Sequence, residues 1–239
     1  MKGTKRTIVM ICGLGILLIF LSSFTKAQNK FPDAIERSES AGRIIKLLAN
    51  PSDSDLPKEL INKSIAIGVF PKVEKFTAMF THLTQGYGVI SARGENGWTV
   101  PAFYLFGGGG FGNPFAKNDM YSVVLLFMTK DAVGTLEKGR IRLNGNKNAL
   151  AGPVGAITEE QRKDLKNAQI LAYAYYNGTL KGIAFGKDFG LGPDNKINTP
   201  LYNIKGYEVL AGKKIDSAKL LEGITAYQEA LQKYCGDNK

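Results

Sequence analysis

The chain has 239 residues and a formal net charge of +10, which arises from 31 lysine and arginine residues against 21 aspartate and glutamate residues. This length is sufficient for one domain with a sizeable hydrophobic core, so the fold needs no metal or disulfide for its stability. With one histidine and two cysteines, the usual ligands of a tetrahedral zinc site cannot be assembled within one chain.

The first 27 residues predict a targeting segment. A basic start, Lys2 to Arg6, precedes an unbroken apolar stretch from Ile8 to Leu21, and Thr25-Lys26-Ala27 follows. This order is typical of a secretory signal peptide, with an apolar region of about 7–15 residues and a small-x-small exit. A membrane-spanning helix needs roughly 20 apolar residues. We therefore expect cleavage after Ala27 and an exported chain, periplasmic or secreted and peripherally associated with a membrane. The alternative is an uncleaved N-terminal anchor.

Cleavage would change both the charge and the cysteine content. The segment holds four basic and no acidic residues, so its removal lowers the net charge from +10 to +6. A modest positive surplus fits an anionic lipid or a cell-surface polymer as partner, or simply a soluble basic surface. The export signal and the lack of a basic tract argue against a nucleic acid. Cys235 remains as a single thiol, which excludes an intrachain disulfide.

In the N-terminal half, apolar periodicity predicts helices first and strands afterwards. Residues 33–49 have apolar side chains on one face and end at Asn50-Pro51, which predicts a helix. A second, short helix is expected from Leu56 to about Lys63. The apolar run Ile65–Phe70 is ended by Pro71, as a buried strand would be. The further strands that we expect are Phe76–Leu83, Tyr87–Ala92, Trp98–Phe106 and Tyr121–Met128.

The C-terminal half contains the clearest hairpin. Ile170–Tyr176 and Thr179–Phe185 flank Asn177-Gly178, and Asn-Gly supplies the positive φ angles of a type I′ turn. The other elements that we expect are a helical turn at Asp131–Leu136, a strand at Arg140–Leu143, a Gly/Asp/Asn-rich loop at Asp188–Pro200, and a terminal helix at about 216–234 with Asp216 as its N-cap.

Many strands joined by short turns, with no helix of ten or more residues between them, indicate an antiparallel sheet. We therefore predict a single α+β domain over residues 28–239. Its sheet is strongly curved, mainly antiparallel and barrel-like, with helices at the N- and C-terminal ends. The glycine run Gly107–Gly110 and the block Ala151–Gly155 predict close backbone packing or close approach of a ligand.

Motifs for catalysis are missing from the sequence. Neither a G-x-S-x-G elbow nor a G-x-x-x-x-G-K-[ST] phosphate loop occurs. Gly107, Gly109 and Gly112 satisfy G-x-G-x-x-G, but Asn113-Pro114 follows where a dinucleotide fingerprint would open a helix. His82 lies in a strand segment that leans apolar, where a structural role is favoured over a catalytic one.

Cation binding by side-chain oxygens has one weak candidate. Asp188, Asp194 and Asn195 could hold a calcium ion, but their spacing misses the EF-hand loop, and a solvated turn is the favoured interpretation. We therefore expect no catalytic residue, no cofactor and no metal.

Two groups of basic residues are candidate binding sites. Lys138, Arg140 and Arg142 alternate along an expected strand, so their side chains emerge from one face and can meet lipid phosphates. The alternative is an edge strand protected from aggregation by its charges. In the first helix, Arg43 and Lys46 flank apolar residues as in an interfacial helix. The alternative there is packing of the helix onto the sheet.

An ordered series of blocks resembles the SYLF domain of bacterial exported proteins and eukaryotic membrane-trafficking proteins. The resemblance covers roughly Ser38 to Gly212. Its blocks are Leu56-Pro57, Ser64–Pro71, Gly86–Arg93, Gly97–Ala102, Gly107–Gly112, Asp119 with the strand to Met128, Ala151–Gly155, and Ile170–Tyr176 with Gly178 and Lys181–Ile183.

The resemblance implies a lipid-binding module without catalysis. It implies phosphoinositides as the ligands of eukaryotic members, actin as a partner of some fungal ones, and membrane contact through a helix that Ser38–Leu48 resembles. We therefore expect an exported, non-enzymatic protein that binds membrane lipid, preferably anionic phospholipid. The expected lipid-binding residues are Arg43, Lys46, Lys138, Arg140 and Arg142. A module that docks an envelope protein is the first alternative, and a hydrolase that uses carboxylates is the second.

Overall fold

A computed structural model describes residues 31–50, 55–78, 81–109, 120–137, 139–145, 147–186, 189–216 and 220–236. The predicted signal segment 1–27 and its cleavage site lie outside these residues. Residues 34–239 form one compact unit, to which the following description refers.

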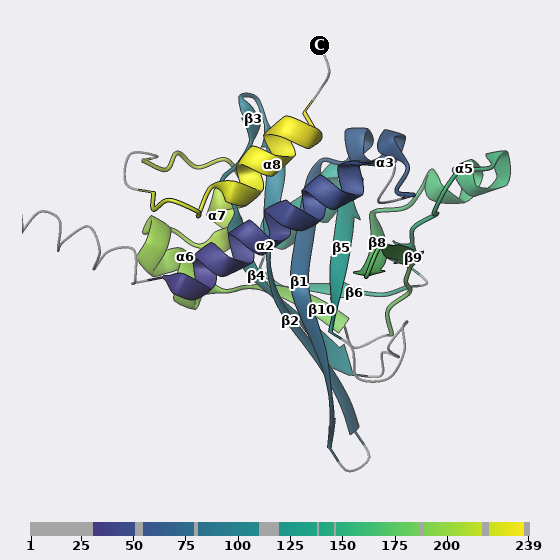
Figure 1. The fold of residues 1–239 in the computed structure, drawn as a ribbon, viewed down its shortest axis with the longest axis horizontal. Helices are drawn as coiled ribbons and strands as arrows, with labels where there is room; N and C mark the ends of the chain where they lie inside the picture. The colour runs from purple at the N-terminus through teal and green to yellow at the C-terminus, as the bar shows by residue number, and fades with distance from the viewer. Residues whose placement is uncertain are drawn as a thin grey trace, which may run out of the picture. The chain divides into compact units, whose positions relative to one another are not determined.

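Along this unit two helices precede the strands, two short helices interrupt them, and three helices follow them (Figure 1). The helices are α2 (Pro32–Ala49), α3 (Lys58–Lys63), α4 (Lys130–Glu137), α5 (Glu159–Leu165), α6 (Asn195–Tyr202), α7 (Gly206–Leu210) and α8 (Ala226–Tyr234). The strands are β1 (Ala66–Ala78), β2 (Thr81–Gly94), β3 (Gly97–Trp98), β4 (Ala102–Gly109), β5 (Tyr121–Phe127), β6 (Ile141–Leu143), β7 (Ala149–Ala151), β8 (Ile170–Tyr176), β9 (Thr179–Gly182) and β10 (Phe189–Pro193).

The strands form a ten-stranded sheet in the order β6-β10-β4-β2-β1-β5-β8-β7, with β3 beside β2 and β9 beside β8. Every pair is antiparallel except β7 and β8, which are parallel. The sheet is curved and barrel-like. The predicted α+β class, the mainly antiparallel sheet and the helices at both ends of the domain are confirmed.

Several element boundaries differ from the sequence prediction. β1 does not end at Pro71 but continues to Ala78, because the register shifts between Val69 and Lys72 and places the proline at an irregularity. The predicted strand Phe76–Leu83 is wrong, since Ala78 pairs with Thr81 and its two halves belong to β1 and β2. The predicted strand Trp98–Phe106 is divided into β3 and β4.

The predicted loop at Asp188–Pro200 is also wrong. Residues from Phe189 onward form β10 and α6, because Phe189 and Leu191 are buried on one side of β10 while Gly190 and Gly192 lie on the other. The terminal helix α8 begins at Ala226, ten residues after the predicted N-cap Asp216. The Asn177-Gly178 turn is confirmed, with φ angles of 44° and 77°.

The sheet has two faces with different surroundings. One face, which we call the helix face, carries Ile67 and Val69 of β1 and Val89 of β2, and α2 and α8 lie across it (Figure 1). The opposite face points into the curve of the sheet. There Phe106 of β4 packs against Phe70 and Phe189, with ring centroids 5.3 and 5.4 Å apart. This division determines which side chains are available to a ligand.

The two glycine blocks provide close packing. A Cβ on Gly107 would lie 2.9 Å from the Thr84 carbonyl oxygen of the neighbouring strand, and a Cβ on Gly152 would overlap the ring of Tyr173. Both Cβ atoms would be closer to their neighbours than an ordinary contact allows, so larger residues would force the backbone apart. The predicted close backbone packing is confirmed at these positions. Gly110 to Gly112 and Asn113-Pro114 lie outside the described residues.

Candidate functional site

The apolar side of α2 packs within the fold. Ala41, Ile45 and Leu48 are buried, and the latter two line a cavity together with Ile67 of β1. Gly42 permits a close crossing of α2 and α8, because a Cβ there would lie 2.9 Å from the Ala226 carbonyl oxygen. The structure therefore gives α2 the packing role that was the alternative to an interfacial helix.

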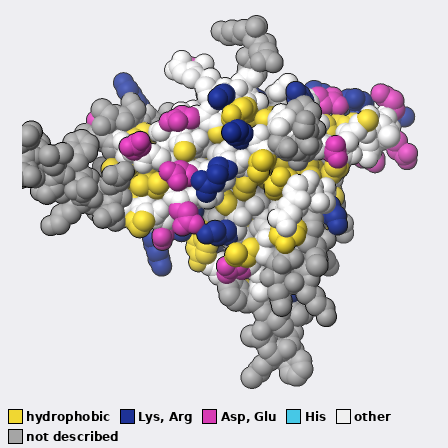
Figure 2. Space-filling view, in the orientation of Figure 1, with side chains coloured by type: hydrophobic (Ala, Val, Ile, Leu, Met, Phe, Trp, Pro, Cys, Tyr) yellow, Lys and Arg dark blue, Asp and Glu magenta, His cyan; other side chains and the backbone are white. Residues whose placement is uncertain are grey.

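The outer side of α2 carries the two predicted basic residues. Arg43 and Lys46 are exposed, and the neighbouring Leu47 is 37% exposed. Arg43 donates a hydrogen bond to Ser40 Oγ at 2.8 Å, and neither cation forms an ion pair with a carboxylate of the described residues. In Figure 2 dark-blue side chains lie along the middle of the molecular face that α2 crosses. This outer side is the first candidate binding surface.

Polar contacts fix α2 against the start of α6, the α8 region and β2. Arg37 forms a largely buried ion pair with Asp194 at 2.9 Å, and its guanidinium lies 4.6 Å from the ring centroid of Tyr87. Ser38 Oγ donates to the Ile224 carbonyl at 2.7 Å and accepts from the Tyr227 N–H at 3.1 Å. Sequence reasoning missed Arg37, because nothing in the local pattern relates it to a residue 157 positions later.

An exposed ion pair joins α2 to β1. Lys72 Nζ lies 2.5 Å from Glu36 Oε1, and hydrogen bonding and attraction by this ammonium lower the pKa of the Glu36 carboxyl. The charge of Lys72 is therefore already engaged within the fold.

The second predicted basic group lies at the edge of the sheet. Ile141 and Leu143 of β6 are buried, whereas Arg140 and Arg142 are exposed, so both arginines emerge on one side as predicted. Neither forms an ion pair with a carboxylate of the described chain. Lys138 lies outside the described residues. β6 is an edge strand of three residues, so the protective role weighed above also fits it.

The structure does not bring the two basic groups together. Ile45 and Leu48 of α2 lie over β1 and β5, while β10, β4 and β2 separate β6 from β1 in the sheet order. The two groups are separate candidate surfaces.

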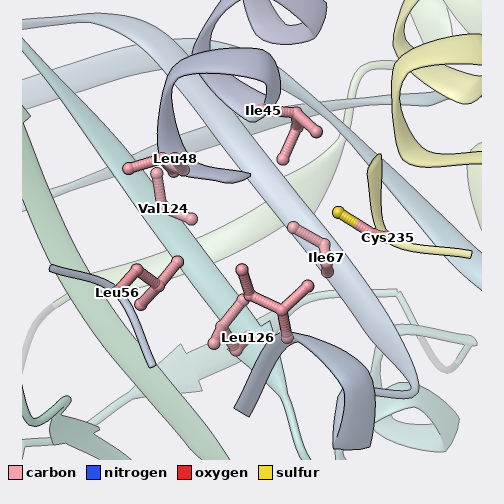
Figure 3. A pocket seen from close by; sticks show the side chains of 8 residues that line it. Ile45, Leu48, Leu56, Ile67, Val124, Leu126 and Cys235 are labelled. Atoms are coloured by element: carbon pink, nitrogen blue, oxygen red, sulfur yellow. The ribbon is translucent and has the colours of Figure 1, made fainter. Parts of the chain in front are cut away.

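An apolar cavity lies beneath α2 (Figure 3). Its lining consists of aliphatic side chains and one thiol, those of Ile45, Leu48, Leu56, Ile61, Ile67, Val124, Leu126 and Cys235. The space in it that a water molecule could occupy is about 10 Å³, far below the roughly 300–1,000 Å³ of typical ligand pockets. We interpret it as a packing space of the core.

Cys235 has an environment that suppresses its reactivity. Burial raises the pKa of its thiol to about 12, although the nearby Arg93 acts in the opposite direction. Arg93 also donates a hydrogen bond to the Cys235 carbonyl at 2.8 Å, which attaches the end of α8 to β2. A thiol of this kind is typical of a structural residue.

The described part of the structure offers no group of side chains suited to a metal ion. Asp194, for which the sequence favours a solvated turn over a calcium site, is buried and paired with Arg37, and the Asn195 side chain accepts from the Gly206 N–H at 3.1 Å. Across the described ranges no three His, Cys, Asp or Glu side chains are grouped as a metal site would require. Asp188 and the side chain of His82 lie outside the description. No described helix combines the length and apolar character needed to cross a membrane.

A family model described as "Ysc84: Las17-binding protein actin regulator" matches residues 107–233, which is more than half of the chain. The chain belongs to the SYLF family, which this model represents. The resemblance found in the sequence blocks is thereby confirmed.

Curated relatives support this assignment. LAS seventeen-binding protein 3 of Saccharomyces cerevisiae is 24% identical over 218 residues, which cover 88% of this chain and 40% of that protein. SH3 domain-containing YSC84-like protein 1 of Xenopus laevis is 25% identical over 220 residues, which cover 85% of this chain and 64% of that protein. The chain thus spans less than two thirds of the length of these relatives.

Proposed function

We propose that this protein is an exported, non-enzymatic SYLF protein that binds anionic phospholipid at its surface. The observation that carries the proposal is a set of exposed cations, Arg43, Lys46, Arg140 and Arg142, without carboxylate partners among the described residues. Unpaired guanidinium groups suit phosphate, because their planar donors make bidentate hydrogen bonds. The small volume of the cavity beneath α2 favours a surface site over an enclosed one.

Vesicle co-sedimentation of the chain without residues 1–27 tests this proposal. We expect binding to phosphatidylglycerol-containing vesicles at low salt and much weaker binding to phosphatidylcholine vesicles. Added salt should weaken the anionic binding, since exposed charges are screened within about 10 Å at 0.1 M. Absence of binding to every composition at low salt would exclude the proposal.

Paired substitutions show which cations contribute. Arg43→Ala with Lys46→Ala and Arg140→Ala with Arg142→Ala each remove two exposed charges. Lys163→Ala with Lys166→Ala at α5 is the matched control, because these two lysines are also exposed. At least one of the first two pairs should weaken binding several-fold more than the control.

Docking of a protein partner is a second candidate. The family description names Las17 binding and actin regulation, and the yeast relative carries the same partner in its name. If such a role extends to this chain, a variant that no longer binds vesicles should still capture a defined envelope protein. Loss of protein capture together with vesicle binding would contradict an independent docking role.

A further inference from the structure

The helix face of the sheet has a second half that the described helices do not bury. Going down β2, Val89 and Ser91 are buried beneath the helices, whereas Tyr87 is 41% and Leu83 is 52% exposed. These four residues are an even number of positions apart along β2, so their side chains point to the same face of the sheet. Arg37 of α2 lies over the ring of Tyr87, so Tyr87 is on the helix face. The part of this face that α2 covers ends at Tyr87. We call the part of this face below α2 the open half.

The strand register defines what else lies on the open half. Tyr87 is opposite Leu105 of β4, which is opposite Gly192 of β10. One row further, Gln85 is opposite Gly107, Gly107 is opposite Gly190, and Gly190 is opposite Arg142 of β6. The exposed apolar residues of β2 and the arginine of β6 are therefore on one face. Three strand spacings separate them, about 14 Å at about 4.8 Å each.

Arg140 extends the cationic edge of this half. A Cβ on Gly192 would lie 3.3 Å from Arg140 Cγ and 3.4 Å from its Nε, so the arginine side chain lies against β10 where that strand has no side chain. Gly107, Gly190 and Gly192 keep intermediate exposure. The surface between the apolar and cationic edges is thus low and accessible.

We propose that the open half is the surface that contacts the membrane, with Leu83 and Tyr87 entering the lipid interface and Arg140 and Arg142 binding lipid phosphates. This inference rests on the proposed phospholipid binding and assigns it to the sheet in preference to α2. The charge and polarity of the surface identify the occupant. Arg140 and Arg142 have no carboxylate partner among the described residues and suit an anionic partner, while Glu74 of β1, opposite Gln85, is an exposed carboxylate on the same face. An exposed leucine beside an exposed tyrosine suits the boundary between head groups and acyl chains.

The apolar edge and the cationic edge should contribute to vesicle binding with different dependence on salt. Contacts of arginine with phosphate are screened by salt, whereas burial of apolar side chains is not. Binding through the open half should therefore have a salt-sensitive part that Arg140→Ala with Arg142→Ala removes. It should also have a salt-resistant part that Leu83→Ser with Tyr87→Ser removes.

Single tryptophan substitutions test the assignment directly. Leu83→Trp places a probe on the open half, and Leu47→Trp places one on the outer side of α2. Val154→Trp is the control, because Val154 is as exposed as Leu47, at 37%, and lies on neither surface. The native Trp98 is buried, so its emission is subtracted as a constant background. Each variant is titrated with phosphatidylglycerol vesicles, with and without acyl chains brominated near the head group.

We expect a blue shift and quenching by the brominated lipid for Leu83→Trp and neither effect for Val154→Trp. If the wild-type chain binds the vesicles but only Leu47→Trp responds, the inference is wrong and α2 is the contact. If the wild-type chain binds no vesicles, the proposed function fails as well. If Leu83→Ser converts a stable dimer into a monomer while vesicle binding is unchanged, the open half is a self-association surface and the inference is overturned.

Discussion

The two halves of the helix face share strand β2 but have opposite surroundings. Where α2 and α8 cross, Ile67, Val69 and Val89 are buried, and the Tyr227 hydroxyl donates to the Ile67 carbonyl at 2.9 Å. Below α2 the face presents exposed side chains of β2 and glycines of β4 and β10. The covered half therefore stabilises the fold, whereas the open half is available to a ligand.

The largest difference should appear in stability. Leu126→Ala in the covered half should reduce the free energy of unfolding by about 2–5 kcal/mol, because it empties space in a packed core. Leu83→Ala in the open half should change it by no more than about 0.5 kcal/mol. Urea denaturation followed by circular dichroism measures both values. Similar losses for the two variants would show that the open half is also packed.

The ion pair at the border between the halves should have the next largest effect. Asp194→Ala leaves Arg37 largely buried without its carboxylate, and we expect a loss of about 2–4 kcal/mol in the same denaturation assay. Arg37→Met with Asp194→Asn should recover part of this loss, since neither charge then remains. If the double variant lost as much free energy of unfolding as Arg37→Met and Asp194→Asn lose separately and in sum, the pairing would be contradicted.

The covered half should also exclude reagents. Because burial raises the pKa of Cys235 to about 12, the thiolate that reacts with maleimide is scarce at pH 8. Native labelling should be at least about 100-fold slower than labelling in denaturant. Mass spectrometry after timed quenching measures both rates. Fast native labelling would show that the end of α8 opens readily.

The smallest effect concerns the exposed pair of Glu36 and Lys72. Lys72 lowers the pKa of Glu36 in the folded chain, so the contribution of this pair is present above the ordinary pKa of a glutamate. It is lost as the pH falls through the lower folded value. Glu36→Gln should remove this small acid-sensitive part, measured as the difference in thermal midpoint between pH 6 and pH 3. An unchanged difference would contradict the prediction.

Local patterns were sufficient to predict much of the fold. The helix at 33–49 follows from its apolar spacing, and the hairpin at Asn177-Gly178 follows from the turn chemistry of two residues. α5 was not predicted, although Thr158 and Gln161 form a capping box that the sequence displays. β10 was missed because its alternation of Phe189 and Leu191 with glycines has the composition of a loop.

The candidate site required information that only the tertiary structure contains. Alternation places Arg140 and Arg142 on one face of a strand, and this part could be predicted. The position of Tyr87 beyond the cover of α2 depends on where a helix some 50 positions earlier crosses the sheet. The register that joins β6 to β2 through two glycine-containing strands cannot be derived from any single segment.

Hydrogen–deuterium exchange of the chain with and without phosphatidylglycerol vesicles distinguishes the open half from α2 as the membrane contact. The proposed open-half contact predicts slower exchange in peptides that cover residues 83–87, 105–109 and 140–143, with α2 unchanged. Protection confined to residues 40–49, or no protection while the chain co-sediments with the vesicles, would contradict it.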